Sequence, residues 1–252
     1  ADLPVAERAA RLRNDRALRA ALLEDRPDDG FTRWMTYALT RASELGDPPD
    51  YEPDPATDSM AARAGAVGGC PWELALDLLA DGDGAGLLLF PFENFTAGDL
   101  VGLRELLIDD NTICGLGDGG AHVATICDAS YPTFLLSHWA RDRSRGPGIE
   151  MERLVAKQTS ETARAYGLLD RGVIVPGYRA DVNVVDFDRL SVDVPRVVHD
   201  LPAGGRRLVQ RSIGYDHTLV AGVEVSRDGE LTGERPGRLL RGQTATPSGL
   251  RS

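Results

Sequence analysis

The fold class is decided by residues 87–120, which read LLLFPFENFTAGDLVGLRELLIDDNTICGLGDGG. The apolar run at 87–90 is typical of a short strand that is buried on both faces. Asp99 can open a helix whose apolar stripe is formed by Leu100, Leu103, Leu106 and Leu107. Residues 112–114 then indicate a second strand. Strand, helix and strand within about 30 residues predict a βαβ unit with parallel strands.

Helical patterns flank this unit on both sides. They predict helices over 4–24, 32–45, 57–68, 71–80, 131–141 and 150–166. From Pro176 onward the pattern changes to short valine-rich runs, and Asp228-Gly229 is a strong hairpin signal. The sequence therefore predicts an α/β part, residues 1–166, followed by a mostly β part, residues 167–252.

Charge and composition exclude several classes of protein. The 252 residues carry a formal net charge of −11, and residues 50–130 hold fifteen acidic residues against two arginines. A nucleic-acid partner would need clustered basic residues, so none is expected. The longest uncharged apolar stretch, near 86–92, is far shorter than a membrane span. Three cysteines without a C-x-x-C spacing favour a reducing cytoplasm over a disulfide framework.

The usual catalytic signatures are missing from the printed sequence. The four histidines are scattered without an H-x-H or H-E-x-x-H spacing, and no serine stands in G-x-S-x-G. Residues 115–120, GLGDGG, match the dinucleotide fingerprint G-x-G-x-x-G formally. That fingerprint belongs inside a βαβ unit and opens its helix, whereas here the predicted unit lies before the motif.

Asp118 is the candidate catalytic residue. It follows the predicted strand at 112–114 and lies among four glycines. In α/β barrels this edge of the sheet holds the catalytic side chains, and glycines allow close approach of backbone and substrate. An alternative is that Asp118 only closes a glycine-rich turn through its own side chain. The residues alone leave both interpretations open.

Three segments together carry a resemblance to a known family. They are TICGLGDGGAH at 112–122, GLLDRGVIVPGYRADVNVVDF at 167–187 and HTLVAGVEVSRDGELTGERPG at 217–237. In this order they resemble the C-terminal part of an amidohydrolase-superfamily enzyme, nearest to the D-aminoacylase (N-acyl-D-amino-acid deacylase) branch.

The resemblance implies a fold and a site. It implies the last strands and helices of a partial (β/α)8 TIM-type barrel, followed by part of a small β-sandwich, and one or two zinc ions. Asp118 would take a proton from metal-bound water and deliver it to the leaving amine, and in some relatives this aspartate also ligates the metal. His122 would contact substrate, although it could equally order the loop.

The resemblance also implies the activity, which is zinc-dependent hydrolysis of an amide C–N bond in a small N-acyl amino acid. The family's metal-binding histidine motifs are missing, so the other ligands are expected outside this chain. We therefore expect the C-terminal portion of a longer enzyme, which could be inactive alone. One alternative is a non-catalytic remnant or subunit that joins a complementary N-terminal chain or forms a homo-oligomer. A second alternative is a cyclic-amide hydrolase of the same superfamily.

Overall fold

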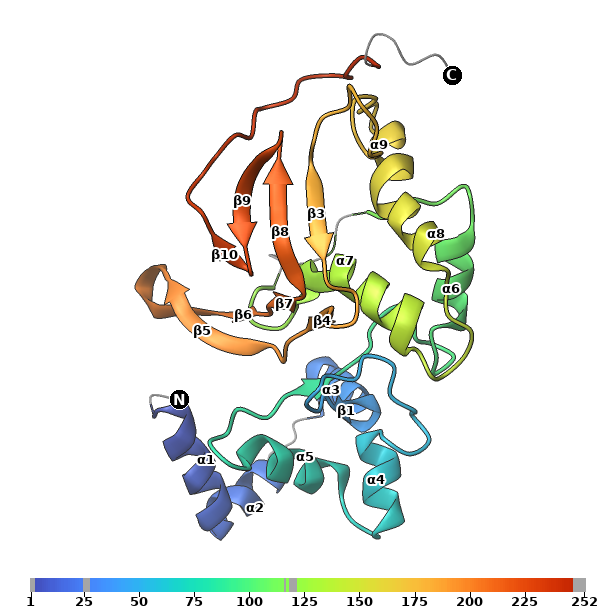
Figure 1. The fold of residues 1–252 in the computed structure, drawn as a ribbon. Coiled ribbons are helices and arrows are strands. Elements are labelled where there is room, and N and C mark those ends of the chain that lie inside the picture. The colour runs from blue at the N-terminus through green and yellow to red at the C-terminus, as the bar shows by residue number, and fades with distance from the viewer. Residues whose placement is uncertain (1–2, 25–27, 116, 118–121, 247–252) are drawn as a thin grey trace. The chain divides into compact units, whose positions relative to one another are not determined.

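The computed structural model describes residues 3–24, 28–115, 117 and 122–246. Helices and strands are mixed along the chain, which confirms the predicted mixture of the two (Figure 1). The chain divides into two units, residues 1–102 and 103–252. Across the described ranges, no helix has both the length and the apolar character that a bilayer crossing requires.

The first unit is mainly helical. Its elements are α1 (Val5–Asn14), α2 (Arg16–Glu24), α3 (Gly30–Arg41), β1 (Ser43–Glu44), α4 (Met60–Ala66), α5 (Pro71–Ala80) and β2 (Leu88–Leu89). Its core forms around Ala42, Met60 and Ala75, and is completed by the partly buried Leu39, Leu74, Leu78, Leu88 and Phe90. The predicted helices are confirmed: the one at 71–80 has the predicted bounds, the one at 57–68 is shorter, and the one at 32–45 begins and ends earlier than predicted.

The helix predicted over residues 4–24 is two helices. The chain breaks at Asp15, whose backbone is extended (φ −98°, ψ 91°). The Asp15 carboxylate accepts a hydrogen bond from the Leu18 backbone N–H at 2.9 Å. An aspartate that satisfies a free N–H at a helix start favours a new helix over continuation of the old one.

The predicted βαβ unit is wrong in its strand pairing. β2 is antiparallel to β1, with Ser43 opposite Leu89 and Glu44 opposite Leu88. A short apolar run specifies burial but contains no information on strand direction, so the sequence pattern could not distinguish these pairings. The helix between the two predicted strands does form, as α6 (Val101–Ile108).

The strand predicted at residues 112–114 does not form. The Thr112 backbone carbonyl accepts a hydrogen bond from the side chain of Lys157, which lies on a distant helix. A strand requires a neighbouring backbone to take these groups, and here a side chain takes one of them.

The second unit begins with helices and ends with strands. Its helical elements are η1 (Asp128–Ser130), α7 (Tyr131–Phe134), the π-helical η2 (Leu135–Asp142), α8 (Met151–Ala156), the π-helical η3 (Lys157–Glu161), α9 (Thr162–Ala165) and η4 (Pro202–Gly204). Its strands are β3 (Val182–Val185), β4 (Ser191–Val192), β5 (Arg196–Leu201), β6 (Gly205–Val209), β7 (Ser212–Ile213), β8 (Tyr215–Val220), β9 (Val223–Arg227) and β10 (Glu230–Leu231). The helices predicted over 131–141 and 150–166 are confirmed.

The largest sheet is antiparallel, with strand order β10-β9-β8-β3 (Figure 1). Asp228 and Gly229 form the two-residue turn between β9 and β10, and both have positive φ, +48° and +78°. This is the geometry of a type I′ hairpin, so the hairpin predicted here is confirmed. The predicted boundary between residues 166 and 167 lies inside the second unit, where helix gives way to strand, and it stays a prediction.

A network of ion pairs joins the end of the helices to the sheet. Arg171 donates to Asp170 at 2.9 Å and to Asp181 at 3.1 Å. Asp181 also accepts from the Ala221 backbone N–H at 2.8 Å, and Thr244 Oγ1 donates to Asp170 at 2.8 Å. The hydrogen bond from Arg171 holds the pKa of Asp170 below its usual value, with a smaller contribution from Thr244. The motif at 167–187 therefore ties three distant segments of this unit together.

We predict that Glu224 on β9 stabilises this sheet in a pH-dependent way. It binds Arg227 and His217, each at 2.5 Å, and these hydrogen bonds lower the pKa of Glu224 from 4.5 to about 2. A lowered pKa stabilises the fold above the unfolded pKa, and this contribution is lost as the pH falls towards the folded value. Glu224→Gln should lower the Tm near neutral pH, and the difference from wild type should vanish as the pH approaches about 2.

Thermal unfolding followed by circular dichroism between about pH 2 and pH 7 measures this effect. Glu230→Gln is the matched control, because Glu230 is 77% exposed and meets Arg211 only at 3.4 Å. An exposed pair of this kind contributes little to stability. A Glu224→Gln difference that stays constant across the whole pH range would contradict the assignment.

Candidate functional site

The predicted catalytic residue, Asp118, lies outside the described residues, and so do its neighbours at 119–121. The described chain reaches this segment through residues 112–115 and Gly117, and it resumes at His122. The site is therefore described by what holds the chain on each side of Asp118.

The approaching chain is held at three points. Lys157 binds the backbone of Thr112, and the Tyr131 hydroxyl donates to the Gly115 carbonyl. Gly117 lies against η1, where an added Cβ would come within 2.7 Å of the Asp128 carbonyl oxygen and 3.0 Å of a Tyr131 ring carbon. No side chain fits between these backbones, so glycine is required at position 117. At position 117 the motif therefore contains glycine because of this close packing.

The departing chain begins with a strained residue. His122 has φ +44°, in the left-handed region, where histidine is found more often than most residues. Its carbonyl accepts from the backbone of Thr125 at 2.7 Å and Ile126 at 3.2 Å, closing a tight turn. The His122 side chain is exposed. The structure thus gives His122 a definite role in the turn, while its predicted contact with substrate stays a prediction.

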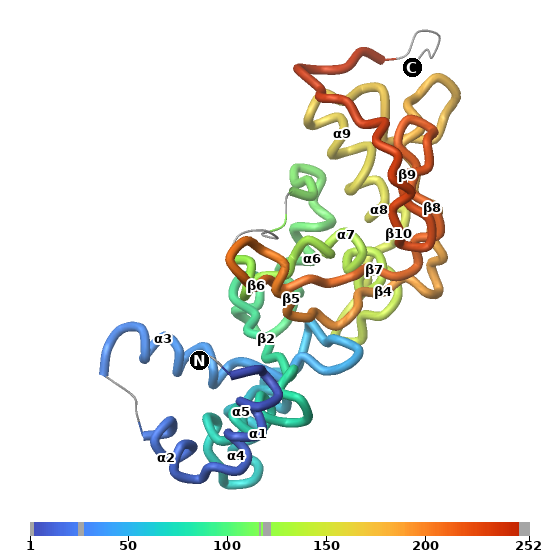
Figure 2. The backbone as a smooth tube through the Cα atoms, turned by 90° about the vertical axis from the view of Figure 1, so that its left-hand side faces the viewer, coloured from blue at the N-terminus to red at the C-terminus, as the bar shows by residue number. Residues whose placement is uncertain are grey.

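The following residues are tied to the β-rich part of the unit. The Leu208 backbone N–H on β6 donates to the Val123 carbonyl at 2.7 Å, and Figure 2 shows β6 running beside this part of the chain. Thr133 on α7 is buried, and it bonds Ser212 at 2.8 Å and Tyr215 at 3.0 Å. Ser130 bonds the side chain of Gln210. Sequence reasoning missed these polar residues, because they are common residue types with no diagnostic spacing.

Three ionisable groups near the segment are shifted towards their neutral forms. Burial raises the pKa of the Cys114 thiol, the Cys127 thiol and the Tyr131 phenol. A thiol with a raised pKa is protonated at neutral pH, and neither nucleophilic attack nor metal ligation uses the protonated form. Cys114 is buried and Cys127 is half-buried, and both pack as small side chains in this environment.

A metal site does not assemble from the described residues. Within residues 3–24, 28–115, 117 and 122–246, no three His, Cys, Asp or Glu side chains converge as a metal ion would require. Structural zinc needs four ligands, and catalytic zinc usually takes three from the protein. The described residues by themselves do not fit the zinc that the resemblance implies, so no chemical step is assigned to a metal here.

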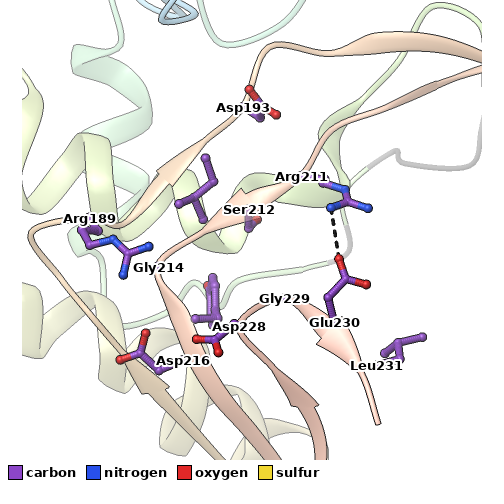
Figure 3. A pocket seen from close by; sticks show the side chains of 12 residues that line it. Arg189, Asp193, Arg211, Ser212, Gly214, Asp216, Asp228, Gly229, Glu230 and Leu231 are labelled. Carbon is purple, nitrogen blue, oxygen red and sulfur yellow. Dashed lines mark hydrogen bonds and ion pairs between the residues drawn. The ribbon is translucent and has the colours of Figure 1, made fainter. Parts of the chain in front are cut away.

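A surface groove of about 700 Å³ lies in the β-rich part of the unit (Figure 3). Its lining includes Arg189, Asp216 and Asp228, and an ion pair of Arg211 with Glu230 at 3.4 Å. The Arg189 and Arg211 side chains are 67% and 64% exposed. Charges this exposed remain in contact with water. His122, which is the described one of the two predicted site residues, is not among the residues that line the groove.

Comparison with known proteins gives the family. The model of a family described as "Amidohydrolase family" matches residues 94–226, which is more than half of the chain. The chain therefore belongs to the amidohydrolase family, and the resemblance found in the sequence is confirmed.

Three curated relatives match part of this chain. N-acyl-D-glutamate deacylase of Alcaligenes xylosoxydans xylosoxydans is 38% identical over 93 residues, covering 37% of this chain and 17% of that protein. D-aminoacylase of the same organism is 34% identical over 106 residues, covering 42% and 19%. Adenine deaminase 1 of Rhizobium meliloti (strain 1021) is 30% identical over 106 residues, covering 37% and 19%. The chain thus spans less than one fifth of each of these relatives.

Solved structures of D-aminoacylase are also similar. One, described as defining a novel subset of amidohydrolases, has 23% identity, a TM-score of 0.41, and coverage of 78% of this chain and 37% of its own. A second, described by its binuclear metal center, has 21% identity, a TM-score of 0.39, and coverage of 89% and 45%. TM-scores below 0.5 are too low to establish a shared fold.

We predict that an alanine is tolerated much better at position 115 than at position 117. Gly117→Ala should destabilise the fold by about 1–3 kcal/mol, because the methyl group would overlap the Asp128 backbone. Gly115→Ala is the matched control, since an added Cβ there meets no atom within 4 Å. Urea unfolding of both variants measures the difference in the free energy of unfolding. Equal losses for the two variants would show that the backbone contact at Gly117 is not formed.

Proposed function

We propose that this chain is the C-terminal part of a metal-dependent hydrolase that cleaves the amide C–N bond of an N-acyl-D-amino acid. The observation that carries the proposal is the 38% identity to N-acyl-D-glutamate deacylase, together with membership in the amidohydrolase family. The architecture that goes with it is the end of a (β/α)8 barrel in residues 1–166, followed by part of a β-sandwich in 167–252. The same proposal includes one or two zinc ions and a cytoplasmic location.

Asp118 is the proposed acid–base residue. Amide hydrolysis needs a group that takes a proton from the attacking water and a group that protonates the leaving amine. One carboxylate can do both in turn, because it is regenerated when it gives up the proton. The anchoring of residues 112–117 and 122–123 supports this role, since proton transfer requires the catalytic group to be held within hydrogen-bond reach of the reacting atoms.

His122 is the proposed substrate contact, and the remaining metal ligands are proposed to come from outside this chain. The exposure of the His122 side chain supports the first part, because the imidazole is free of the protein interior. Support for the second part is that the described residues do not assemble a metal site. The substrate alternative is a cyclic amide, and the likeness to adenine deaminase 1 keeps it open, because that relative is not named as a deacylase.

Activity is tested on the polypeptide that includes the natural upstream sequence. We expect release of the free amino acid from N-acetyl-D-glutamate and N-acetyl-D-leucine, with little release from the L isomers. Asp118→Asn should lower kcat by about 100-fold or more, because it removes the proton carrier and keeps the side-chain shape. Asp188→Asn, an exposed aspartate on a β-turn, is the control and should retain wild-type kcat.

Retention of kcat in Asp118→Asn would remove Asp118 from the proton-transfer role. Cleavage of adenine or a cyclic amide in place of the N-acyl substrates would replace the deacylase proposal with the cyclic alternative. Metal analysis of the active polypeptide identifies the ion, and zinc is the expected result.

A second candidate function is association with a complementary chain, either as a subunit or as a non-catalytic remnant. Exposed apolar side chains favour it, among them Phe31 at 71%, Phe92 at 65% and Ile174 at 88% exposure. Large apolar side chains in contact with water favour binding of a partner or of a second copy. Sedimentation should show self-association of this chain alone, and a monodisperse monomer at micromolar concentration would contradict it.

A further inference from the structure

One face of the helix formed by α8 and η3 carries Arg153, Lys157 and Glu161, four residues apart. All three point to the turn that follows α6. Arg153 donates to the Ile108 carbonyl at 3.1 Å and pairs with Asp110. Residues four apart lie on the same helix face, so one surface of this helix holds a single turn of the distant chain.

Lys157 is the centre of this contact and the only lysine in the sequence. Its side chain is 1% exposed. The ammonium group donates to the carbonyls of Asp109 and Thr112 and, at 2.9 Å, to the Thr112 hydroxyl. An ammonium has three donors and here meets three acceptors, so all of its hydrogen-bonding capacity is used.

The positive charge of Lys157 is also compensated by a nearby carboxylate. Glu161 Oε2 lies 3.9 Å from the Lys157 ammonium, and Arg153 holds the other Glu161 oxygen at 3.1 Å. A buried ammonium is strongly disfavoured without such partners. Burial of this lysine therefore serves to hold the backbone at residues 109–112.

This backbone leads directly to the proposed catalytic residue. Thr112 precedes Asp118 by six residues, and within that interval the Tyr131 hydroxyl holds the Gly115 carbonyl. We propose that Lys157 is a positioning residue: it fixes the chain at Asp109 and Thr112 and so sets the path that delivers Asp118 to the reacting amide. This inference rests on the proposed function.

The geometry distinguishes lysine from its usual replacements. Arginine presents a planar fork and needs more room than a compact ammonium, and methionine fills the space but donates no hydrogen bond. In Lys157→Met the ammonium no longer holds the Asp109 and Thr112 carbonyls. The Asp109 carbonyl keeps its hydrogen bonds from the Thr112 backbone and hydroxyl, so what is lost is the connection between the helix and this turn. A displacement of about 1 Å at a catalytic group can reduce turnover by about 100-fold.

The experiment measures kcat and KM of Lys157→Met in the polypeptide with its natural upstream sequence, at a temperature where circular dichroism shows it fully folded. We expect kcat to fall by about 10- to 100-fold, with KM within about threefold of wild type, because the proposal gives Lys157 no contact with the substrate. Lys157→Arg should recover only part of the lost kcat. Arg164→Met is the matched control on the same run of helix and should keep wild-type kcat, because the bonds that Arg164 makes within the described residues go to Ser160, one turn before it.

Hydrogen exchange gives a second readout that does not depend on turnover. Amides of residues 109–117 should exchange faster in Lys157→Met than in wild type, while those of β8 and β9 stay unchanged. A folded Lys157→Met variant with wild-type kcat overturns the proposal, and so does unchanged exchange at 109–117. If wild type cleaves no N-acyl amino acid, the proposed function fails, and the exchange result still decides whether Lys157 anchors this segment.

Thr112→Val decides the matter if Lys157→Met does not fold. This variant removes the hydroxyl that accepts from the ammonium and that also donates to the Leu106 and Asp109 carbonyls. Faster hydrogen exchange at residues 109–115 together with a fall in kcat at unchanged KM supports the proposal, and faster exchange with a wild-type kcat overturns it.

Discussion

The Lys157 ammonium takes the place of a neighbouring strand for the chain that follows α6. The Lys157 side chain is 1% exposed. Its ammonium donates hydrogen bonds to the Asp109 and Thr112 carbonyls. A buried carbonyl without a donor is costly, so a segment that leaves a helix must find donors on a strand, in water or on a side chain. Here the donor is a side chain, and the rest of the anchoring follows from it. Tyr131 and the backbone at Asp128 then hold residues 115 and 117 in turn.

Residues 167–187, the second of the three segments that carry the family resemblance, have a structural role. Arg171 binds both Asp170 and Asp181, the Ala221 backbone N–H donates to Asp181, and the Thr244 hydroxyl donates to Asp170. Gly172 has φ +87°, and an added Cβ would lie 2.9 Å from the Ser160 Cα, so this turn packs directly on the helix that carries Lys157. The charged motif therefore fixes the junction of helix and sheet and does not itself form a reaction site.

The sequence predicted local elements better than their pairing. Periodicity located the helices at 71–80 and 150–166, and Asp228-Gly229 located its hairpin, because helix stripes and type I′ turns depend on neighbouring residues alone. The prediction of a strand at 112–114 was wrong because the conformation of this segment depends on Lys157, which lies 45 residues from Thr112 in the sequence. For the site, the motif could name Asp118 and His122. It could not reveal the polar contacts of Thr133 and Ser130, which bring together residues about 80 positions apart.

Strand β2 shows why the pairing of a short apolar run cannot be predicted from the run itself. In the described part of the chain β2 pairs with the two-residue β1, and Phe92, close to the end of β2, is 65% exposed. An apolar run indicates burial, but neither the direction nor the length of its partner strand follows from it. Anchoring of Thr112 and Gly115 by Lys157 and Tyr131 does not depend on this pairing, because every group involved belongs to the second unit.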